Sequence, residues 1–129
     1  QQQIDYQINI SNEVAEKSIN VPAFIIQPFA ENAIWHGLMP KPGYKQLLIH
    51  ITFTSGNTLE INIIDNGIGR ASATKTHPYK NEQKQSKGVG LINERLRLLQ
   101  QDAMIVFEDL YDTAGNATGT RVVIRIPCP

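Results

Sequence analysis

The chain has 129 residues, 41% of them hydrophobic and 19% charged, which is enough for one domain with a buried core. Its 12 basic and 12 acidic side chains give a formal net charge of zero, so no global field attracts nucleic acid or an acidic membrane, and any phosphate site must be local. The lone Cys128 excludes an internal disulfide, no Cys/His cluster indicates zinc, and no apolar run reaches the ~18 residues of a membrane span.

The first half of the chain predicts a strand, a helix and a hairpin. Apolar and polar residues alternate in QIDYQINI (3–10), which is typical of a half-buried strand. In NVPAFIIQPFAENAIWHGL (20–38) the apolar residues recur at helical spacing; Gly37 suits the helix end, and Pro28 is expected to kink the axis. The alternating segments LLIHITFT (47–54) and TLEINIID (58–65) predict an antiparallel hairpin with one buried face.

The second half predicts a long loop, a helix and two strands. Residues 70–87 contain almost nothing that packs, which favours a lid or a binding loop. VGLINERLRLLQQ (89–101) has a helical stripe, and MIVFEDLY (104–111) and TRVVIRIP (120–127) read as strands around a turn-rich segment. This order predicts a single α+β domain over residues 1–129, a two-layer sandwich in which helices cover one face of a mixed, mostly antiparallel sheet.

An unusual strand end occurs in INIIDNGIGR (61–70), where an apolar run stops at Asp65 and Gly67 and Gly69 follow. The glycines permit a tight turn and the close approach of a flat ligand. A carboxylate in such a cleft can accept a hydrogen bond from an exocyclic amine. Taken alone, however, D-N-G also favours an ordinary solvated turn.

Two further segments carry chemistry. In KGVGL (87–91), Gly88 and Gly90 precede a predicted helix, whose N-terminal amides bind phosphate, although a flexible junction explains the same residues. In QPFAENAIWHG (27–37), Asn32 and His36 share a helix face, and the amide oxygen of Asn32 suits Mg²⁺. A solvated position for Glu31 and a helix-dipole role for His36 remain open.

Together, ENAIWHG, DNGIG and SKGVGLINERLRLL resemble, in order and spacing, the N, G1 and G2 boxes of the GHKL superfamily. That superfamily includes the ATPase domains of gyrase, heat-shock chaperones, MutL and histidine kinases. The segments VPAFIIQPFAENAIWHG and KGVGLINERLRLL are similar to the LytS-type branch of bacterial sensor histidine kinases, over about residues 5–127. The resemblance implies the Bergerat ATP-binding fold.

The resemblance also implies roles for individual residues. Asp65 would accept from the adenine amino group with the support of Thr120, while Gly67 and Gly69 let the adenine and ribose approach. Asn32 would ligate a Mg²⁺ ion that bridges the ATP phosphates. Phosphate binding as the lid closes would fall to Lys87, Gly88, Gly90 and the amide of Leu91. Glu31 and His36 belong to the N box and are the candidate catalytic residues.

The implied function is that of the ATP-binding catalytic domain of a two-component sensor histidine kinase. Such a domain donates the γ-phosphate of Mg-ATP to a histidine on an upstream helical dimerisation domain, for relay to a response-regulator aspartate. His36, His50 and His77 lie in no such helical segment, so the acceptor is expected upstream, and this chain alone is not expected to autophosphorylate. The resemblance implies a cytoplasmic domain of a homodimer anchored in the bacterial inner membrane, with no nucleic-acid partner.

Two alternatives remain open from the sequence. A GHKL ATPase could use hydrolysis to drive a conformational change. Pro28, however, stands where hydrolysing members of the superfamily carry a general-base glutamate, which favours phosphoryl transfer. A degenerate, nucleotide-free interaction module would keep the three boxes for structure alone.

Overall fold

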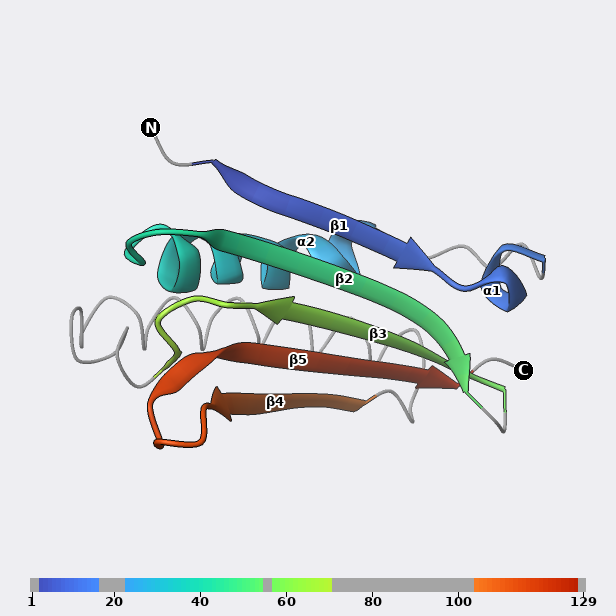
Figure 1. Cartoon of the computed structure of the whole chain (residues 1–129). Coiled ribbons are helices and arrows are strands. Elements are labelled where there is room, and N and C mark those ends of the chain that lie inside the picture. The colour runs from blue at the N-terminus through green and yellow to red at the C-terminus, as the bar shows by residue number, and fades with distance from the viewer. Residues whose placement is uncertain (1–2, 17–22, 55–56, 71–103, 128–129) are drawn as a thin grey trace.

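The computed structural model describes residues 3–16, 23–54, 57–70 and 104–127. In these ranges the elements follow one another as β1 (Ile4–Ile10), α1 (Asn12–Glu16), α2 (Ala23–Asn32), the π-helix η1 (Ala33–Leu38), β2 (Lys45–Thr54), β3 (Thr58–Asp65), β4 (Met104–Tyr111) and β5 (Ala117–Pro127) (Figure 1). The five predicted strands and the first predicted helix are confirmed. The helix predicted over 89–101, and the predicted loop beyond Arg70, lie outside the described residues.

The strands form one sheet in the order β1-β2-β3-β5-β4. β1 runs parallel to β2 and every other neighbouring pair is antiparallel, which confirms the mixed, mostly antiparallel sheet. α2 and η1 lie along one face of this sheet (Figure 1). Among the described residues, no helix combines the length and apolar character that crossing a membrane requires.

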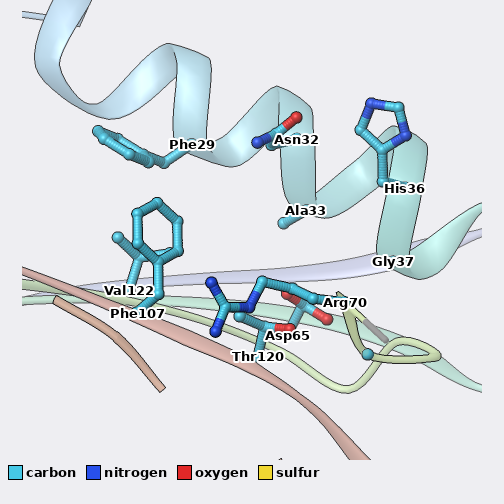
Figure 2. Close-up of a pocket in the computed structure, with 11 residues that line it drawn as sticks. Phe29, Asn32, Ala33, His36, Gly37, Asp65, Arg70, Phe107, Thr120 and Val122 are labelled. Carbon is cyan, nitrogen blue, oxygen red and sulfur yellow. The ribbon is translucent and has the colours of Figure 1, made fainter. Parts of the chain in front are cut away.

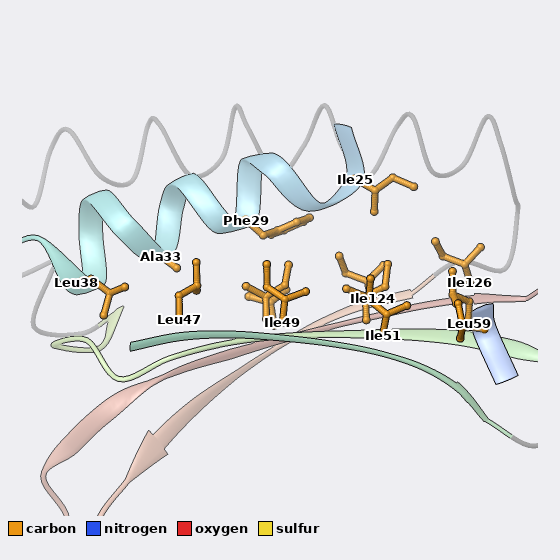
Figure 3. Packing of buried hydrophobic residues seen from close by; sticks show 14 residues of the cluster. Ile25, Phe29, Ala33, Leu38, Leu47, Ile49, Ile51, Leu59, Ile124 and Ile126 are labelled. Atoms are coloured by element: carbon orange, nitrogen blue, oxygen red, sulfur yellow. The ribbon is translucent and has the colours of Figure 1, made fainter. Parts of the chain in front are cut away.

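The core lies between this helical layer and the three central strands (Figure 3). Side chains alternate between the two faces of a strand, so one apolar set of each strand faces α2. Ile61 of β3 and Ile124 of β5, which are paired in the sheet, are fully buried there together with Phe29 of α2. Burying a side chain of this size stabilises the fold by about 2 kcal/mol, so the alternation fixes which sheet face the helices cover.

The helix departs from the sequence prediction at its end. Pro28 lies inside α2, and after Asn32 the helix widens into the π-helix η1, a form that often occurs at functional sites. Gly37 does not end the helix: it is buried within η1, and the element continues to Leu38. The reason for a glycine there is a close backbone contact, described below.

The prediction of a half-buried first strand is wrong for most of β1. Ile4 packs against the core, but Tyr6, Ile8 and Ile10 are 60%, 61% and 55% exposed. β1 is an edge strand, and the helical layer packs mainly on β2, β3 and β5. The apolar alternation was read correctly as a strand, but alternation alone does not show whether another element covers the apolar face.

Candidate functional site

A pocket opens between the helical layer and the ends of β3 and β5 (Figure 2). Its space is about 430 Å³, including the opening to solvent. The helix side is lined by Phe29, Asn32, Ala33, His36 and Gly37, and the sheet side by Asp65, Gly69, Arg70, Phe107, Thr120 and Val122. Apolar walls with a few convergent polar groups are typical of small-molecule sites.

Asp65 is the buried acid of this pocket. It is the last residue of β3, and strand alternation turns its side chain toward the helices, where it is only 6% exposed. Burial raises the pKa of Asp65 to about 6, because the charged form loses its hydration, while hydrogen bonds from the backbone of Gly67 and Thr120 act in the opposite direction. The Gly67 N–H donates to Asp65 Oδ1 at 2.9 Å. The solvated-turn alternative for D-N-G is therefore wrong.

Glycines bring three backbone segments together around Asp65. A Cβ atom on Gly67 would overlap the carbonyl carbon and oxygen of Gly37, and the Ile68 N–H donates to the Gly37 oxygen at 3.0 Å. Gly119 has a φ of 144°, and a Cβ atom there would overlap the carbonyl oxygen of Asp65. Only residues without side chains allow η1, the loop after β3 and β5 to converge on the carboxyl group.

Asn66 fixes the same loop from the other side. Its Oδ1 accepts from the Gln46 N–H at 2.7 Å, and its Nδ2 donates to the Tyr44 oxygen at 3.2 Å. The Asn66 N–H also donates to the Gln46 oxygen at 3.2 Å. The loop after β3 is thus anchored to the start of β2, which holds Asp65 in one position relative to the pocket.

Two of the three N-box candidates line the pocket and one does not. Asn32 and His36 project from the helix above Asp65 (Figure 2), and the Asn32 side chain forms no capping hydrogen bond to the helix. Glu31 is exposed and lies outside the pocket lining; its Oε1 accepts from Gln27 Nε2 at 2.9 Å. The solvated position for Glu31, which the sequence left open, is the one observed.

Sequence analysis missed the wall formed by Arg70 and Phe107. Arg70 Nε lies 2.8 Å from Asp109 Oδ1, and Arg70 Nη2 lies 3.0 Å from Asp109 Oδ2. The guanidinium carbon is 5.2 Å from the ring centre of Phe107, which in turn lies 6.0 Å from the ring centre of Phe29. One signal was present in the sequence: Asp109 continues the alternation of Ile105 and Phe107, which places a carboxylate in need of a partner on the helix-facing side of β4.

The pocket thus contains Asn32, His36, Asp65, Gly69 and Thr120 from the sequence-predicted set. Gly67 packs against Gly37 beside it. Lys87, Gly88, Gly90 and Leu91 lie outside the described residues. In the part of the chain that is described, no group of three His, Cys, Asp or Glu side chains is arranged to hold a metal ion.

No protein-family model and no curated relative matches the sequence. Solved structures do match, over 96% of this chain. They include the histidine kinase domain of a blue-light activated histidine kinase from Erythrobacter litoralis EL346, with a TM-score of 0.67, 17% identity and 51% of that chain covered. Full-length ShkA in complex with AMPPNP gives 0.58, 17% and 25%. The nucleotide-free catalytic domain of histidine kinase ThkA gives 0.58, 12% and 79%.

These likenesses establish the fold, which is that of histidine kinase catalytic domains. The chain spans about half the length of the Erythrobacter domain. The similarity of the sequence to the LytS-type branch stays a prediction.

Proposed function

We propose that this chain is the ATP-binding catalytic domain of a two-component sensor histidine kinase of the LytS type. It binds Mg-ATP and donates the γ-phosphoryl group to a histidine on an upstream helical domain, from which the group passes to a response-regulator aspartate. The observation that carries the proposal is the buried Asp65 at one end of an apolar-walled pocket, in a fold shared with histidine kinase catalytic domains. Full-length ShkA, which shares this fold, is complexed with AMPPNP, an ATP analogue.

The apolar walls suit a purine ring. Phe29, Ala33 and Val122 offer an apolar slot, and Asp65 lies beside it as a hydrogen-bond acceptor. The exocyclic amine of adenine donates to Asp65, whereas the corresponding carbonyl oxygen of guanine would oppose it. Because an unpaired buried acceptor costs about 1–3 kcal/mol, this contact discriminates adenine from guanine.

The phosphates would extend toward Asn32 and His36, on the helix side of the opening. Asn32 supplies one neutral oxygen, and Mg²⁺ commonly completes its six ligands with phosphate oxygens and water. The ion would supply charge neutralisation when bound. Lys87, Gly88, Gly90 and Leu91 are proposed to complete phosphate binding from the predicted lid.

The lining residues favour phosphoryl transfer over hydrolysis. Among the described lining residues, Asp65 is the only carboxylate, and the Gly67 amide already binds it. At the position of the general base, Pro28 has no side-chain group that could activate water. The Glu31 carboxylate accepts a hydrogen bond from Gln27 outside the pocket lining. An acceptor histidine is itself the nucleophile, so the domain needs chiefly to position the phosphates and offset their charge.

Calorimetry tests the nucleotide site, with Mg-ADP and Mg-GDP compared on the same protein. We expect binding of Mg-ADP and at least tenfold weaker binding of Mg-GDP; no heat with Mg-ADP at millimolar concentration would support the nucleotide-free module instead. Radiolabelled ATP then tests the reaction. Label is expected only on a longer chain that includes the upstream helices, and steady phosphate release by this chain alone would support the ATPase alternative.

A further inference from the structure

Within the described part of the chain, β1 is an unusually open sheet edge. Edge strands are commonly protected by bulges, prolines, lysines or charge pairs. The opposite edge, β4, has a register irregularity at Leu110/Tyr111 and carries two charge pairs, Glu108 with Arg121 and Asp109 with Arg70. β1 pairs with β2 in an unbroken register over all seven residues, IDYQINI, and contains neither proline nor a basic residue.

One face of this edge is apolar. Tyr6, Ile8 and Ile10, which we call the β1 strip, are 55–61% exposed. They lie in register with the buried Leu47, Ile49 and Ile51 of β2, so the strip continues the core beyond the edge of the helical layer. The one charged residue, Asp5, is on the other face and accepts a hydrogen bond from the Tyr44 hydroxyl at 2.7 Å.

The backbone of β1 is oriented for a further antiparallel strand. The Ser11 N–H donates to the Ile51 oxygen at 2.9 Å, directly after the end of β1. In a parallel pair, alternate residues bond to the neighbouring strand, so the odd-numbered residues of β1 bond to β2. The N–H and C=O groups of Ile4, Tyr6, Ile8 and Ile10 therefore point away from the sheet.

We propose that β1 pairs antiparallel with β1 of a second copy of this chain, about a two-fold axis at Gln7. In this register Tyr6 lies opposite Ile8 and Ile4 opposite Ile10, so apolar residues meet apolar residues. Asp5 lies opposite Asn9, so no like charges meet. A one-residue shift would place side chains of opposite faces against each other, and a two-residue shift would pair fewer residues.

The resulting dimer joins two five-stranded sheets edge to edge. An axis perpendicular to the sheet keeps both helical layers, and hence both pockets, on the same side. The interface is isologous, because the same seven residues serve both partners. The proposal is independent of nucleotide binding, since no residue of β1 lines the pocket.

Cross-linking tests the register. In a Cys128→Ser background, Gln7→Cys places two thiols across the axis at a non-hydrogen-bonded pair, where the Cα atoms are about 4.5 Å apart, within the range of a disulfide. Asn9→Cys is the matched control, on the same strand and face, because its two copies would lie about 14 Å apart. We expect a cross-linked dimer of the first variant alone under mild oxidation. Equal rates of cross-linking would overturn the register.

Sedimentation equilibrium tests whether the partner of β1 is a second copy of this chain. We expect a concentration-dependent dimer that Gln7→Lys abolishes, because two ammonium groups then face each other across the axis. Gln7 is exposed and lies opposite the apolar face, so this variant leaves the β1 strip intact. The proposal would be refuted by a dimer that survives Gln7→Lys but is lost in Tyr6→Lys. It would also be refuted by a chain that is monomeric at all concentrations. An intact thermal unfolding transition confirms that each variant folds.

Discussion

Replacing Asp65 by asparagine is expected to stabilise the fold at neutral pH while weakening adenine binding. Burial raises the pKa of Asp65 from 3.8 to about 6. At 1.36 kcal/mol per pKa unit, this shift corresponds to about 3 kcal/mol by which the folded state disfavours the ionised carboxylate. The figure is an upper limit for the gain in the Asp65→Asn variant, because the amide oxygen replaces only part of the carboxylate's capacity to accept the Gly67 and Thr120 bonds.

The sign of the pH dependence follows from the two pKa values. As the pH rises from about 4 to 6, the unfolded chain releases the Asp65 proton while the folded chain retains it, so the free energy of unfolding falls. This contribution is complete below the unfolded pKa and is lost as the pH passes the folded pKa. Asp109 and Asp112 act in the opposite direction, because their pKa values are lowered, by Arg70 and by the Asn116 backbone respectively.

Urea unfolding of the unmodified chain and of the Asp65→Asn variant from pH 4 to 8 isolates the Asp65 contribution. The contributions of the other titratable groups cancel in the difference between the two free energies of unfolding. We expect near equality at pH 4 and a growing advantage of Asp65→Asn that levels off above pH 7, at up to about 3 kcal/mol. A difference that does not change with pH would refute the reasoning. Nucleotide binding should show the reverse dependence on pH: the Mg-ADP affinity of the unmodified chain is expected to rise through about pH 6, since the ionised Asp65 carboxylate is the proposed acceptor of the adenine amine.

Three further outcomes are expected. Arg70→Ala should weaken Mg-ADP binding on the order of tenfold in calorimetry while changing stability by about 1 kcal/mol or less; Arg125→Ala, which removes the outer-face ion pair to Glu60 at 2.9 Å, is the control and should leave binding unchanged. Gly67→Ala should destabilise the chain by about 3 kcal/mol in urea, because its methyl group overlaps the Gly37 backbone, and an unchanged midpoint would contradict that packing. Asn32→Ala should weaken Mg-ADP binding on the order of tenfold, a loss of about 1.4 kcal/mol, yet leave adenosine binding intact; equal losses for both ligands would argue against a metal role.

The local pattern of apolar and polar residues predicted most of the fold. The alternation in β2 and β3 predicted their pairing and their one buried face, and Asp65 continues that buried face because side-chain direction in a strand follows from position. The coverage of β1 did not follow, since exposure depends on which elements lie over a strand. Alternation therefore predicts the presence of an apolar face and not its environment.

The candidate site divides in the same way. Asn32, His36 and Asp65 were recognisable because each lies within a short motif, and strand or helix periodicity gives its direction. The pairing of Arg70 with Asp109 joins residues 39 positions apart, and nothing in either segment names the other. The contact of Gly37 with Gly67 is likewise tertiary. The sequence shows both glycines, but the close approach of their backbones, which explains why neither has a side chain, is visible only in the folded structure.

The two helix-facing carboxylates of the pocket region show why that missed pair matters. For Asp109 the dominant influence is the Arg70 guanidinium, which holds its pKa below the usual range, whereas for Asp65 it is burial, which raises the pKa. The Arg70 guanidinium contacts Asp109 through two N–H···O hydrogen bonds of 2.8 and 3.0 Å. A carboxylate fully paired with arginine would be a poor acceptor for an adenine amine, because its oxygens would already be occupied. Asp65 is thus a buried carboxyl group of raised pKa in the pocket, and under the proposed function its oxygens accept from the base of the nucleotide.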